Sequence, residues 1–181
     1  MLSIDEQKII IKQCVSENAL AQRQLYNAYA GQLFAVCLRY LKQREDAEEA
    51  LSNCWIKIFD HVEQFRFESK LTTWMTRIAV NESLMILRKK NVFFHELNEA
   101  ITEEKDAPDA DESDAAYLMH IIEALPVGFR TVFNLYAIEG YAHKEIAQML
   151  GISEGTSKSQ LSRAREILRK KVEQNMFDYE K

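Results

Sequence analysis

Apolar residues recur every three to four positions along most of the chain, which is the spacing of one face of an α-helix. The pattern predicts helices over residues 3–15, 18–41, 44–61, 71–90, 113–124 and 127–138, followed by two more from residue 143, the last ending near residue 171. Ser3 and Glu6 have the spacing of a capping box, and Ser69 is placed to cap the fourth helix. Only five glycines and two prolines occur in 181 residues. The sequence therefore predicts an all-α protein.

The last two predicted helices are separated by a short turn with the sequence Gly-Ile-Ser at residues 151–153. Glycine accepts the left-handed backbone at a helix end, and serine can cap the helix that follows. Between Thr156 and Lys171 the second helix has six basic residues and one acidic residue, on the side opposite its apolar stripe. This arrangement is typical of a helix-turn-helix that reads DNA in the major groove. The spacing alone also fits a pair of solvated surface helices.

A short segment at residues 63–69 interrupts the helical pattern and has Phe65 and Phe67 on either side of Arg66. An unstacked base can lie against aromatic and guanidinium planes, although such aromatics also serve as core anchors. The helix at 71–90 is apolar nearly all round and is expected at the centre of its domain. It keeps one polar strip, which fits either a nucleic-acid contact or a solvated face: Arg77, Asn81 and Arg88.

The helix at residues 44–61 has an acidic face opposite its apolar stripe. That face includes one isoleucine, so it fits a protein partner as well as it fits simple solvation. Its members are Glu45, Glu49, Ser52, Asn53, Ile56 and Asp60.

The net charge of −5 is distributed unevenly. Between Glu96 and Asp114 there are nine acidic residues and one basic residue, and the rest of the chain has 22 basic against 19 acidic residues. A segment so acidic and poor in apolar residues is typical of a linker. We therefore expect two small helical domains, residues 1–91 and 113–181, joined by an acidic flexible linker at 92–112. The second is expected to be a four-helix domain that contains the helix-turn-helix.

Several classes of function are not expected from this sequence. The three cysteines and four histidines show no spacing of metal ligands, so buried reduced thiols and no metal or other cofactor are expected. There is no secretory signal and no apolar run long enough to span a membrane, which favours a cytoplasmic protein. Without a glycine-rich phosphate loop or a nucleophile motif, an enzyme is not expected.

Together these motifs resemble those of bacterial RNA polymerase sigma factors of the extracytoplasmic-function group. In the first domain the resemblance rests on QLYNAY (24–29), REDAEEA (44–50), FR (65–66) and LTTWMTRIAVN (71–81). In the second it rests on LP (125–126), GY (140–141), EIA (145–147), GISEGT (151–156), KS (158–159) and SRAR (162–165). The resemblance covers nearly the whole chain, with both domains in the same order.

The resemblance implies a non-catalytic transcription initiation factor whose partners are core RNA polymerase and promoter DNA. It implies that the acidic helix binds the clamp of the largest polymerase subunit through Glu45, Asp46, Glu49, Ser52, Asn53 and Ile56. It assigns melting and reading of the −10 element to Phe65, Arg66, Phe67, Trp74, Arg77, Asn81 and Arg88. It assigns reading of the −35 element to Lys158, Ser159, Gln160, Ser162, Arg163, Arg165 and Lys170. The family also allows an inhibitory anti-sigma factor as a partner.

The chain departs from the family pattern in the acidic helix and in the second helix of the helix-turn-helix. Ser52 and Asn53 stand where the family usually has Gln-Glu, and Trp55 replaces a phenylalanine. Ser157 stands where a buried apolar residue is usual, and Gln160 where many members have arginine. The detail of the clamp contact and the base preference are therefore not transferred.

Two other functions fit parts of the pattern. A conventional helix-turn-helix regulator would have the same second domain, but its sensory domain would need a ligand pocket in place of the aromatic loop and the polar strip. A helical adaptor without a nucleic-acid role fits the net acidity, but not the basic helix of the helix-turn-helix.

If residues 92–112 form a linker, limited proteolysis of the full chain should cut there first, because packed helices protect their backbone from proteases. We expect the earliest cleavage sites between Glu96 and Asp114, as mapped by mass spectrometry of the fragments. Initial cleavage within residues 44–90 would contradict the division into two domains.

Overall fold

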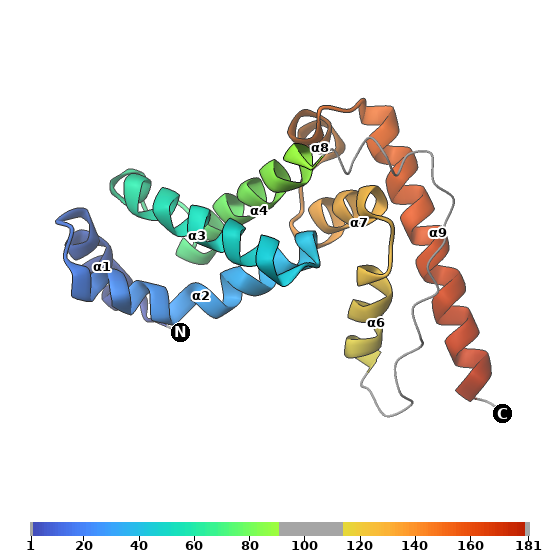
Figure 1. Ribbon diagram of the computed structural model, residues 1–181, viewed down its shortest axis with the longest axis horizontal. Coiled ribbons are helices and arrows are strands. Elements are labelled where there is room, and N and C mark those ends of the chain that lie inside the picture. Colours follow the sequence, from blue (N-terminus) through green and yellow to red (C-terminus); the bar gives the residue numbers. More distant parts are fainter. Residues whose placement is uncertain (1, 91–113, 180–181) are drawn as a thin grey trace. The chain divides into compact units, whose positions relative to one another are not determined.

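The computed structural model describes the backbone of residues 2–90 and 114–179, and the side chains of residues 2–90 and 116–175. These residues are largely helical and include no β-strand, which confirms the all-α prediction. The chain divides into two compact units, Met1–Lys90 and Asn91–Lys181, called the first and second unit below (Figure 1). The predicted acidic linker lies outside the described residues.

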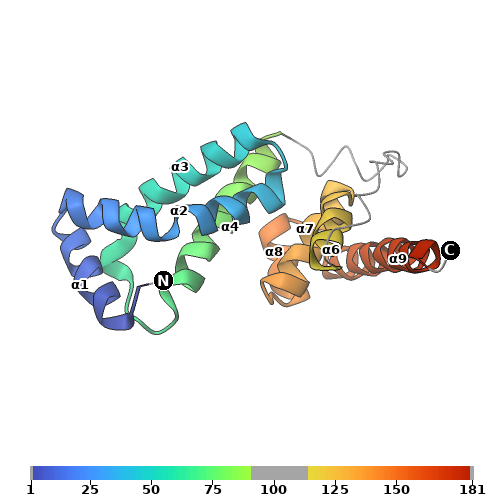
Figure 2. The same cartoon turned by 90° about the horizontal axis from the view of Figure 1, so that it is seen from below.

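The first unit is built around three helices that all pack against one another: α2 (Ala19–Leu41), α3 (Arg44–His61) and α4 (Leu71–Lys89). Helix α1 (Ile4–Val15) packs on α2 and on the short 3₁₀ turn η1 (Val62–Gln64), which follows α3 (Figure 2). The largest buried side chains come from α2, α3 and α4 and include Leu25, Tyr29, Leu33, Ile58, Met75 and Leu84. These helices therefore form one apolar core.

Helix ends in the first unit match the predicted caps in one case and not in another. Ser3 caps α1, with Glu6 N–H donating to Ser3 Oγ at 3.3 Å and Ser3 N–H donating to Glu6 Oε2 at 2.7 Å. The second of these bonds lowers the pKa of Glu6. The prediction that Ser69 caps α4 is wrong, because α4 begins at Leu71, as predicted, and its N-cap position is therefore Lys70, which makes no side-chain cap.

The core of the first unit contains buried polar and thiol groups. Glu82 of α4 is only 4% exposed, and its Oε1 lies 2.5 Å from Nζ of Lys57 on α3. A buried carboxylate is costly without such a partner, so this ion pair also holds the two helices in register. Cys37 and Cys54 are free and buried, as expected, and burial raises their thiol pKa values to about 11 and about 12.

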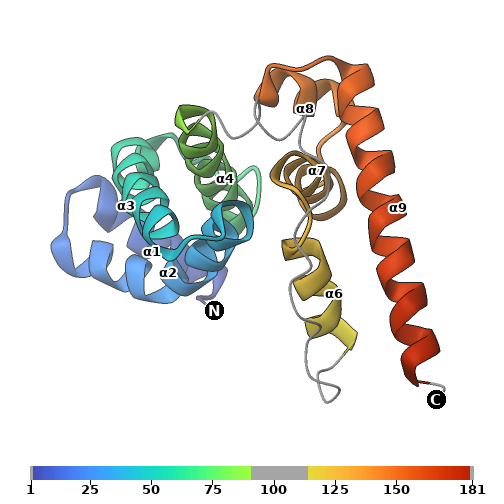
Figure 3. The same ribbon diagram turned by 45° about the vertical axis from the view of Figure 1, so that its right-hand side comes forward.

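The second unit consists of α6 (Asp114–Glu123), α7 (Val127–Phe133), η2 (Asn134–Ile138), α8 (His143–Leu150) and α9 (Glu154–Tyr179). Helix α9 runs past α6 and α7, while α8 packs near the N-terminal end of α9 (Figures 1 and 3). Arg130 of α7 is buried, and its Nη1 donates to the carbonyl oxygens of Leu125 at 3.0 Å and Glu123 at 3.3 Å. A cation thus satisfies carbonyls at the end of α6.

Two predicted helices differ from the structure in this unit. The helix expected at 127–138 is not a single α-helix, because its last five residues form the π-helical turn η2. The extra residue of a π-turn leaves no trace in a helical hydrophobic pattern. Helix α9 also continues to Tyr179, beyond the expected end near Lys171.

The left-handed backbone at Gly151, with φ of +67°, makes this residue a direct test of the turn between α8 and α9. Gly151→Ala should lower the free energy of unfolding of the second unit by about 1 kcal/mol, because a Cβ strains this conformation. Hydrogen exchange of the α8 and α9 amides reports this unit separately.

Gly155 is the matched control, because it lies in the first turn of α9 and a Cβ there would meet only Ser153 Oγ at 3.6 Å. Gly155→Ala should raise the same free energy by about 0.5–1 kcal/mol. Equal effects of the two substitutions would show that the turn does not depend on glycine.

Candidate functional site

The turn between α8 and α9 has the geometry that the sequence predicts for a helix-turn-helix. Gly151 ends α8 in the left-handed conformation, and Ile152 N–H donates to the Ala147 carbonyl at 3.1 Å. Ser153 caps α9, since its Oγ accepts from Thr156 N–H at 2.9 Å. Leu150 and Leu161 are buried on either side of the turn. The crossing of the two helices is thus held by backbone bonds and by apolar contact.

The side of α9 that faces away from the core holds most of the predicted DNA contacts. Their spacing forms two adjacent rows, one with Lys158, Ser162 and Arg165 and the other with Ser159, Arg163 and Lys170. All six of these side chains are exposed. The face is therefore basic, and its side chains are accessible.

Two cations on this face are paired with glutamates one turn away. Lys158 Nζ lies 2.6 Å from Glu154 Oε1, and Lys170 Nζ lies 3.0 Å from Glu166 Oε1. Hydrogen bonds from these lysines lower the pKa values of Glu154 and Glu166, so both carboxylates carry their charge at neutral pH. A phosphate contact by either lysine would compete with its glutamate.

Gln160, which was predicted to read DNA, does not lie on the exposed face of α9. Gln160 is only 7% exposed and faces α7, where a Cβ built on Gly128 would lie 3.6 Å from Gln160 Nε2. The end of the glutamine side chain therefore lies close to the backbone of Gly128. Gln160 is therefore part of the packing between α7 and α9.

A cluster of four side chains beside this face was not found from the sequence. The Tyr136 and His143 rings stack with centroids 4.6 Å apart and planes at 23°, and Cζ of Arg165 lies 5.5 Å from the centroid of the Tyr136 ring. His143 Nδ1 is hydrogen-bonded to Oγ of Ser157 at 2.9 Å, and Ser157 is fully buried. These residues come from η2, α8 and α9, so no linear motif indicates that they meet. The bond to His143 accounts for a serine at a position where the family usually has an apolar residue.

The segment between η1 and α4 forms an exposed loop anchored by one aromatic residue. Phe65 is only 7% exposed, and its ring centroid lies 4.7 Å from that of Phe67 and 5.4 Å from that of Trp74. Phe65, which was predicted to contact DNA, thus has its ring packed in the core, and Phe67 is the exposed aromatic residue of the loop. Phe67 is 39% exposed and has a φ of +59°, a strained backbone for a residue with a side chain.

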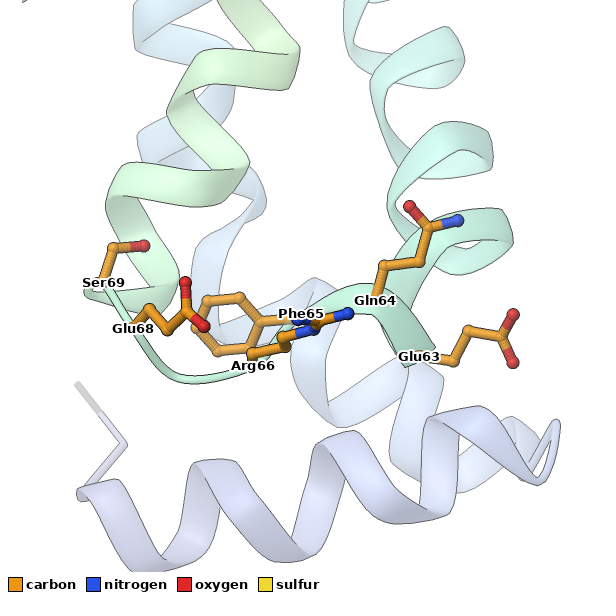
Figure 4. A pocket seen from close by; sticks show the side chains of 6 residues that line it. All are labelled: Glu63, Gln64, Phe65, Arg66, Glu68 and Ser69. Carbon is orange, nitrogen blue, oxygen red and sulfur yellow. The ribbon is translucent and has the colours of Figure 1, made fainter.

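A hollow of about 680 Å³ opens along this loop. Six residues line it: Glu63, Gln64, Phe65, Arg66, Glu68 and Ser69. Figure 4 shows Glu63 and Gln64 at one end of the loop, Glu68 and Ser69 at the other, and the Arg66 side chain between them. Apart from the buried ring of Phe65, the lining side chains are polar and exposed. The hollow therefore offers hydrogen-bond donors and acceptors along the loop that contains Phe67.

Helix α4 begins at the end of this loop and keeps the predicted polar strip on its outer side. Arg77, Asn81 and Arg88 are all exposed, while Trp74 is half-buried against Phe65. An asparagine side chain carries both donor and acceptor groups, and it is flanked here by two cations. The loop and the strip thus come from adjacent parts of the first unit.

Helix α3 exposes most of the residues predicted to meet a protein partner. Glu45, Glu49, Ser52 and Ile56 are exposed, with Ile56 at 60%, whereas Asn53 is half-buried. The Asp46 carboxylate is less accessible than these exposed side chains, because its Oδ2 lies 2.6 Å from Nζ of Lys90. Lys90 follows the last residue of α4, so this ion pair crosses the contact between α3 and α4. A partner that binds Asp46 would have to compete with Lys90.

Trp55, the second departure in this helix, lies in the core and not on its outer face. It is 5% exposed, and its ring centroid lies 5.0 Å from that of Tyr26 and 5.4 Å from that of Phe59. The larger ring therefore adds to the contact between α2 and α3.

Within the described residues, no three His, Cys, Asp or Glu side chains come together as a metal site requires. Among the described helices, none combines the length and the apolar composition needed to cross a bilayer.

Two family models match the chain. Residues 25–92 match Sigma-70 region 2, and residues 115–168 match Sigma-70, region 4. Together the matched segments cover more than half of the chain and include the aromatic loop, the polar strip and the helix-turn-helix.

Curated relatives match over most of their length. The chain is 28% identical over 177 residues to the ECF RNA polymerase sigma factor SigW of Bacillus subtilis, covering 90% of this chain and 94% of that protein. It is 24% identical over 186 residues to the ECF RNA polymerase sigma-E factor of Escherichia coli, covering 92% and 94% respectively.

Solved structures show the same fold. One is the structure of CnrH in complex with the cytosolic domain of CnrY, with a TM-score of 0.52 and 21% identity over 93% of this chain and 97% of that chain. Another is the sigma factor RpoE in complex with the anti-sigma factor NepR from Bartonella quintana, with a TM-score of 0.50 and 22% identity over 83% and 96%.

Proposed function

Because the chain belongs to the extracytoplasmic-function group of RNA polymerase sigma factors, transcription initiation factors that direct the polymerase to promoters, we propose a division of this task between its two units. The first unit opens and reads the −10 element, and the second reads the −35 element. The proposed domains comprise residues 1–91 and 113–181. Core RNA polymerase and promoter DNA are the partners, the polymerase performs the chemistry, and the factor acts in the cytoplasm with it.

The observation that carries this proposal is the pairing of the aromatic loop with the polar strip of α4. Phe67 and Arg66 are exposed beside a polar hollow, and the loop leads directly into the helix that presents Arg77 and Asn81. A stacking ring beside hydrogen-bonding groups suits a base that has left the duplex. Cations further along the strip, such as Arg88, suit the backbone of the same strand.

Energetics favour joint action of the loop and the strip. Extruding a base costs a few kcal/mol, while one stacking contact returns roughly 1–3 kcal/mol. Phe67 alone would therefore not offset the cost. Arg66 precedes Phe67 in the loop, Trp74 packs against Phe65, and Asn81 is proposed to meet the base edge. Several contacts then share the cost, provided that the polymerase holds the first unit on the DNA.

The proposed clamp contact uses the outer face of α3. An acidic face with one exposed isoleucine suits a basic surface that has an apolar pocket. Glu45, Glu49, Ser52, Asn53 and Ile56 remain the proposed contacts, and Asp46 joins them only if its ion pair with Lys90 is broken.

Reading of the −35 element is assigned to the exposed rows of α9. Lys158, Ser159, Ser162 and Arg163 lie near its N-terminal end, the part of a recognition helix that meets base edges. Arg165 and Lys170 are assigned to phosphates. Gln160 is no longer included, because it is buried against α7.

Substitutions on α9 should separate base contacts from packing. Arg163→Ala should cost about 1–3 kcal/mol of affinity for a selected duplex and relax sequence preference, because an arginine that contacts a base edge discriminates between bases. The measurement is competition between a duplex selected from a random library by the full chain and an unselected duplex.

Gln160→Ala is the control for this experiment, because Gln160 lies on the same helix but faces the core. Gln160→Ala should destabilise the second unit. It should leave unchanged the ratio of the affinity for the selected duplex to the affinity for the unselected duplex. If Gln160→Ala altered that ratio as much as Arg163→Ala, the assignment of the exposed rows as readers would fail.

Promoter opening tests the proposed role of the first unit. Asn81→Ala, and Phe67→Ala combined with Arg66→Ala, should leave binding to core polymerase intact, because these residues lie away from the outer face of α3. They should lower permanganate-detected melting on duplex promoters, since contacts with the extruded strand are lost. A template with a pre-melted −10 bubble should partly rescue them, because the cost of opening has already been met.

The matched control is Ile56→Ala, which changes the proposed clamp contact without touching the loop. It should weaken binding to core polymerase, and the pre-melted bubble should not rescue it. Normal melting by the Asn81 and Phe67 variants would reject the proposed −10 role.

A further inference from the structure

Arg165 differs from the two lysines of α9 proposed to contact DNA in how it is held. Lys158 and Lys170 are paired with carboxylates on their own helix, at 2.6 Å and 3.0 Å. The guanidinium of Arg165 lies over the ring of Tyr136, at 5.5 Å from Cζ to the centroid. An aromatic ring attracts a cation through its negative face and does not neutralise the charge. Among the residues that the structure describes, no carboxylate is paired with Arg165, so the ring restrains this side chain without neutralising it.

The ring of Tyr136 is itself fixed by two further residues. Tyr136 stands on the π-turn η2 and is 36% exposed, so packing against the core does not hold it alone. The imidazole of His143, the first residue of α8, stacks on it at 4.6 Å between centroids. Ser157 of α9 is hydrogen-bonded to Nδ1 of that imidazole at 2.9 Å and is fully buried. A chain of contacts therefore runs from the buried side of α9 to the cation on its exposed side.

Resting on the proposed −35 role of the second unit, we propose that Tyr136 is a positioning residue that holds Arg165 ready for a DNA phosphate. His143 and Ser157 fix the ring in turn. Arg165 shares its row with Lys158 and Ser162, so it flanks the proposed base readers. Phosphate contacts of this kind set the register of a recognition helix, and the planar guanidinium can give a phosphate two parallel hydrogen bonds.

Two physical consequences follow for binding. A flexible arginine loses side-chain freedom when it binds a phosphate, and an arginine already restrained by a ring loses less. The lysine pairs must open before those lysines meet a phosphate, whereas Arg165 keeps its charge available. Arg165 should therefore contribute more to DNA affinity than Lys170, although both are exposed basic residues of α9.

The π-turn and the departure at Ser157 have a common explanation in this arrangement. The π-turn places Tyr136 at the surface beside α8, and a hydroxyl at residue 157 orients the imidazole beneath the ring. A buried hydroxyl is costly unless it is hydrogen-bonded, and His143 supplies that bond. An apolar residue at this position could not orient His143.

The test is a double-mutant cycle in the full chain, with a short duplex of mixed sequence as the probe. Mixed sequence suffices because a phosphate contact does not depend on the bases. Dissociation constants are measured by fluorescence anisotropy over a series of salt concentrations for wild type, Tyr136→Leu, Arg165→Ala and the double variant. Circular dichroism confirms that each variant is folded.

Arg165→Ala should weaken binding roughly tenfold, as expected for loss of a charge-assisted contact. It should also lower the slope of log affinity against log salt by about one, the value for one phosphate contact. Tyr136→Leu should weaken binding less, and it should have no further effect once Arg165 is alanine. Tyr136→Phe keeps the ring and should bind as wild type does.

Two further variants make the result specific. Ser157→Ala should weaken binding slightly in the wild-type background and not at all in the Arg165→Ala background. Lys170→Ala should add its own effect to that of Tyr136→Leu, because Lys170 does not touch the ring. If Tyr136→Leu does not fold, Ser157→Ala takes its place in the cycle with Arg165→Ala.

Additive effects of Tyr136→Leu and Arg165→Ala would overturn the inference, because a purely structural stack would weaken binding with or without the arginine. Equal weakening by Tyr136→Phe and Tyr136→Leu would also overturn it. If Arg163→Ala weakens binding while Arg165→Ala and Tyr136→Leu do not, the proposed −35 role stands and the positioning role fails. Binding by the wild type that does not change with salt would reject the −35 role itself.

Discussion

Each unit has to bury an apolar core with a few helices, and this constraint decides which side chains remain for other molecules. Helix α4 packs against both α2 and α3, so only one strip of it stays polar and exposed. Phe65 and Leu71 are buried at either end of the loop before α4, which leaves Arg66 and Phe67 outside. In the second unit, burial of Leu161 and Ala164 turns the basic rows of α9 outward. The candidate contacts are therefore those that the cores do not use.

Buried polar groups fix how neighbouring helices are oriented, which apolar packing alone does not determine. The pair of Glu82 with Lys57 links α4 to α3, and Arg130 links α7 to the end of α6. The bond between His143 and Ser157 links the two helices of the helix-turn-helix. A buried polar group without a partner costs free energy, so each of these bonds favours one arrangement of its helices over others. Side chains on the outer faces are held in place through these buried bonds.

Much of this fold could be predicted from the sequence, because amphipathic periodicity and capping residues act locally. The bounds of α3, the capping box at Ser3 and the turn at Gly151 agree with prediction for this reason. The burial of Gln160 does not follow from the helical pattern, because the residue lies at the edge of the apolar stripe and only packing against α7 covers it. The stack of Tyr136, His143 and Arg165 joins three elements, so only the packed structure shows it. Phe65 was ambiguous, since an aromatic residue in a loop can serve either the core or a ligand.

The central claim is that this chain directs core polymerase to promoters through two separate DNA elements. Run-off transcription with core polymerase of the source bacterium on a library of its genomic fragments tests this most directly. The account predicts transcripts that appear only when the chain is added, with start sites preceded by two conserved blocks at the −10 and −35 positions. The absence of chain-dependent transcripts, or start sites without these two blocks, would contradict it.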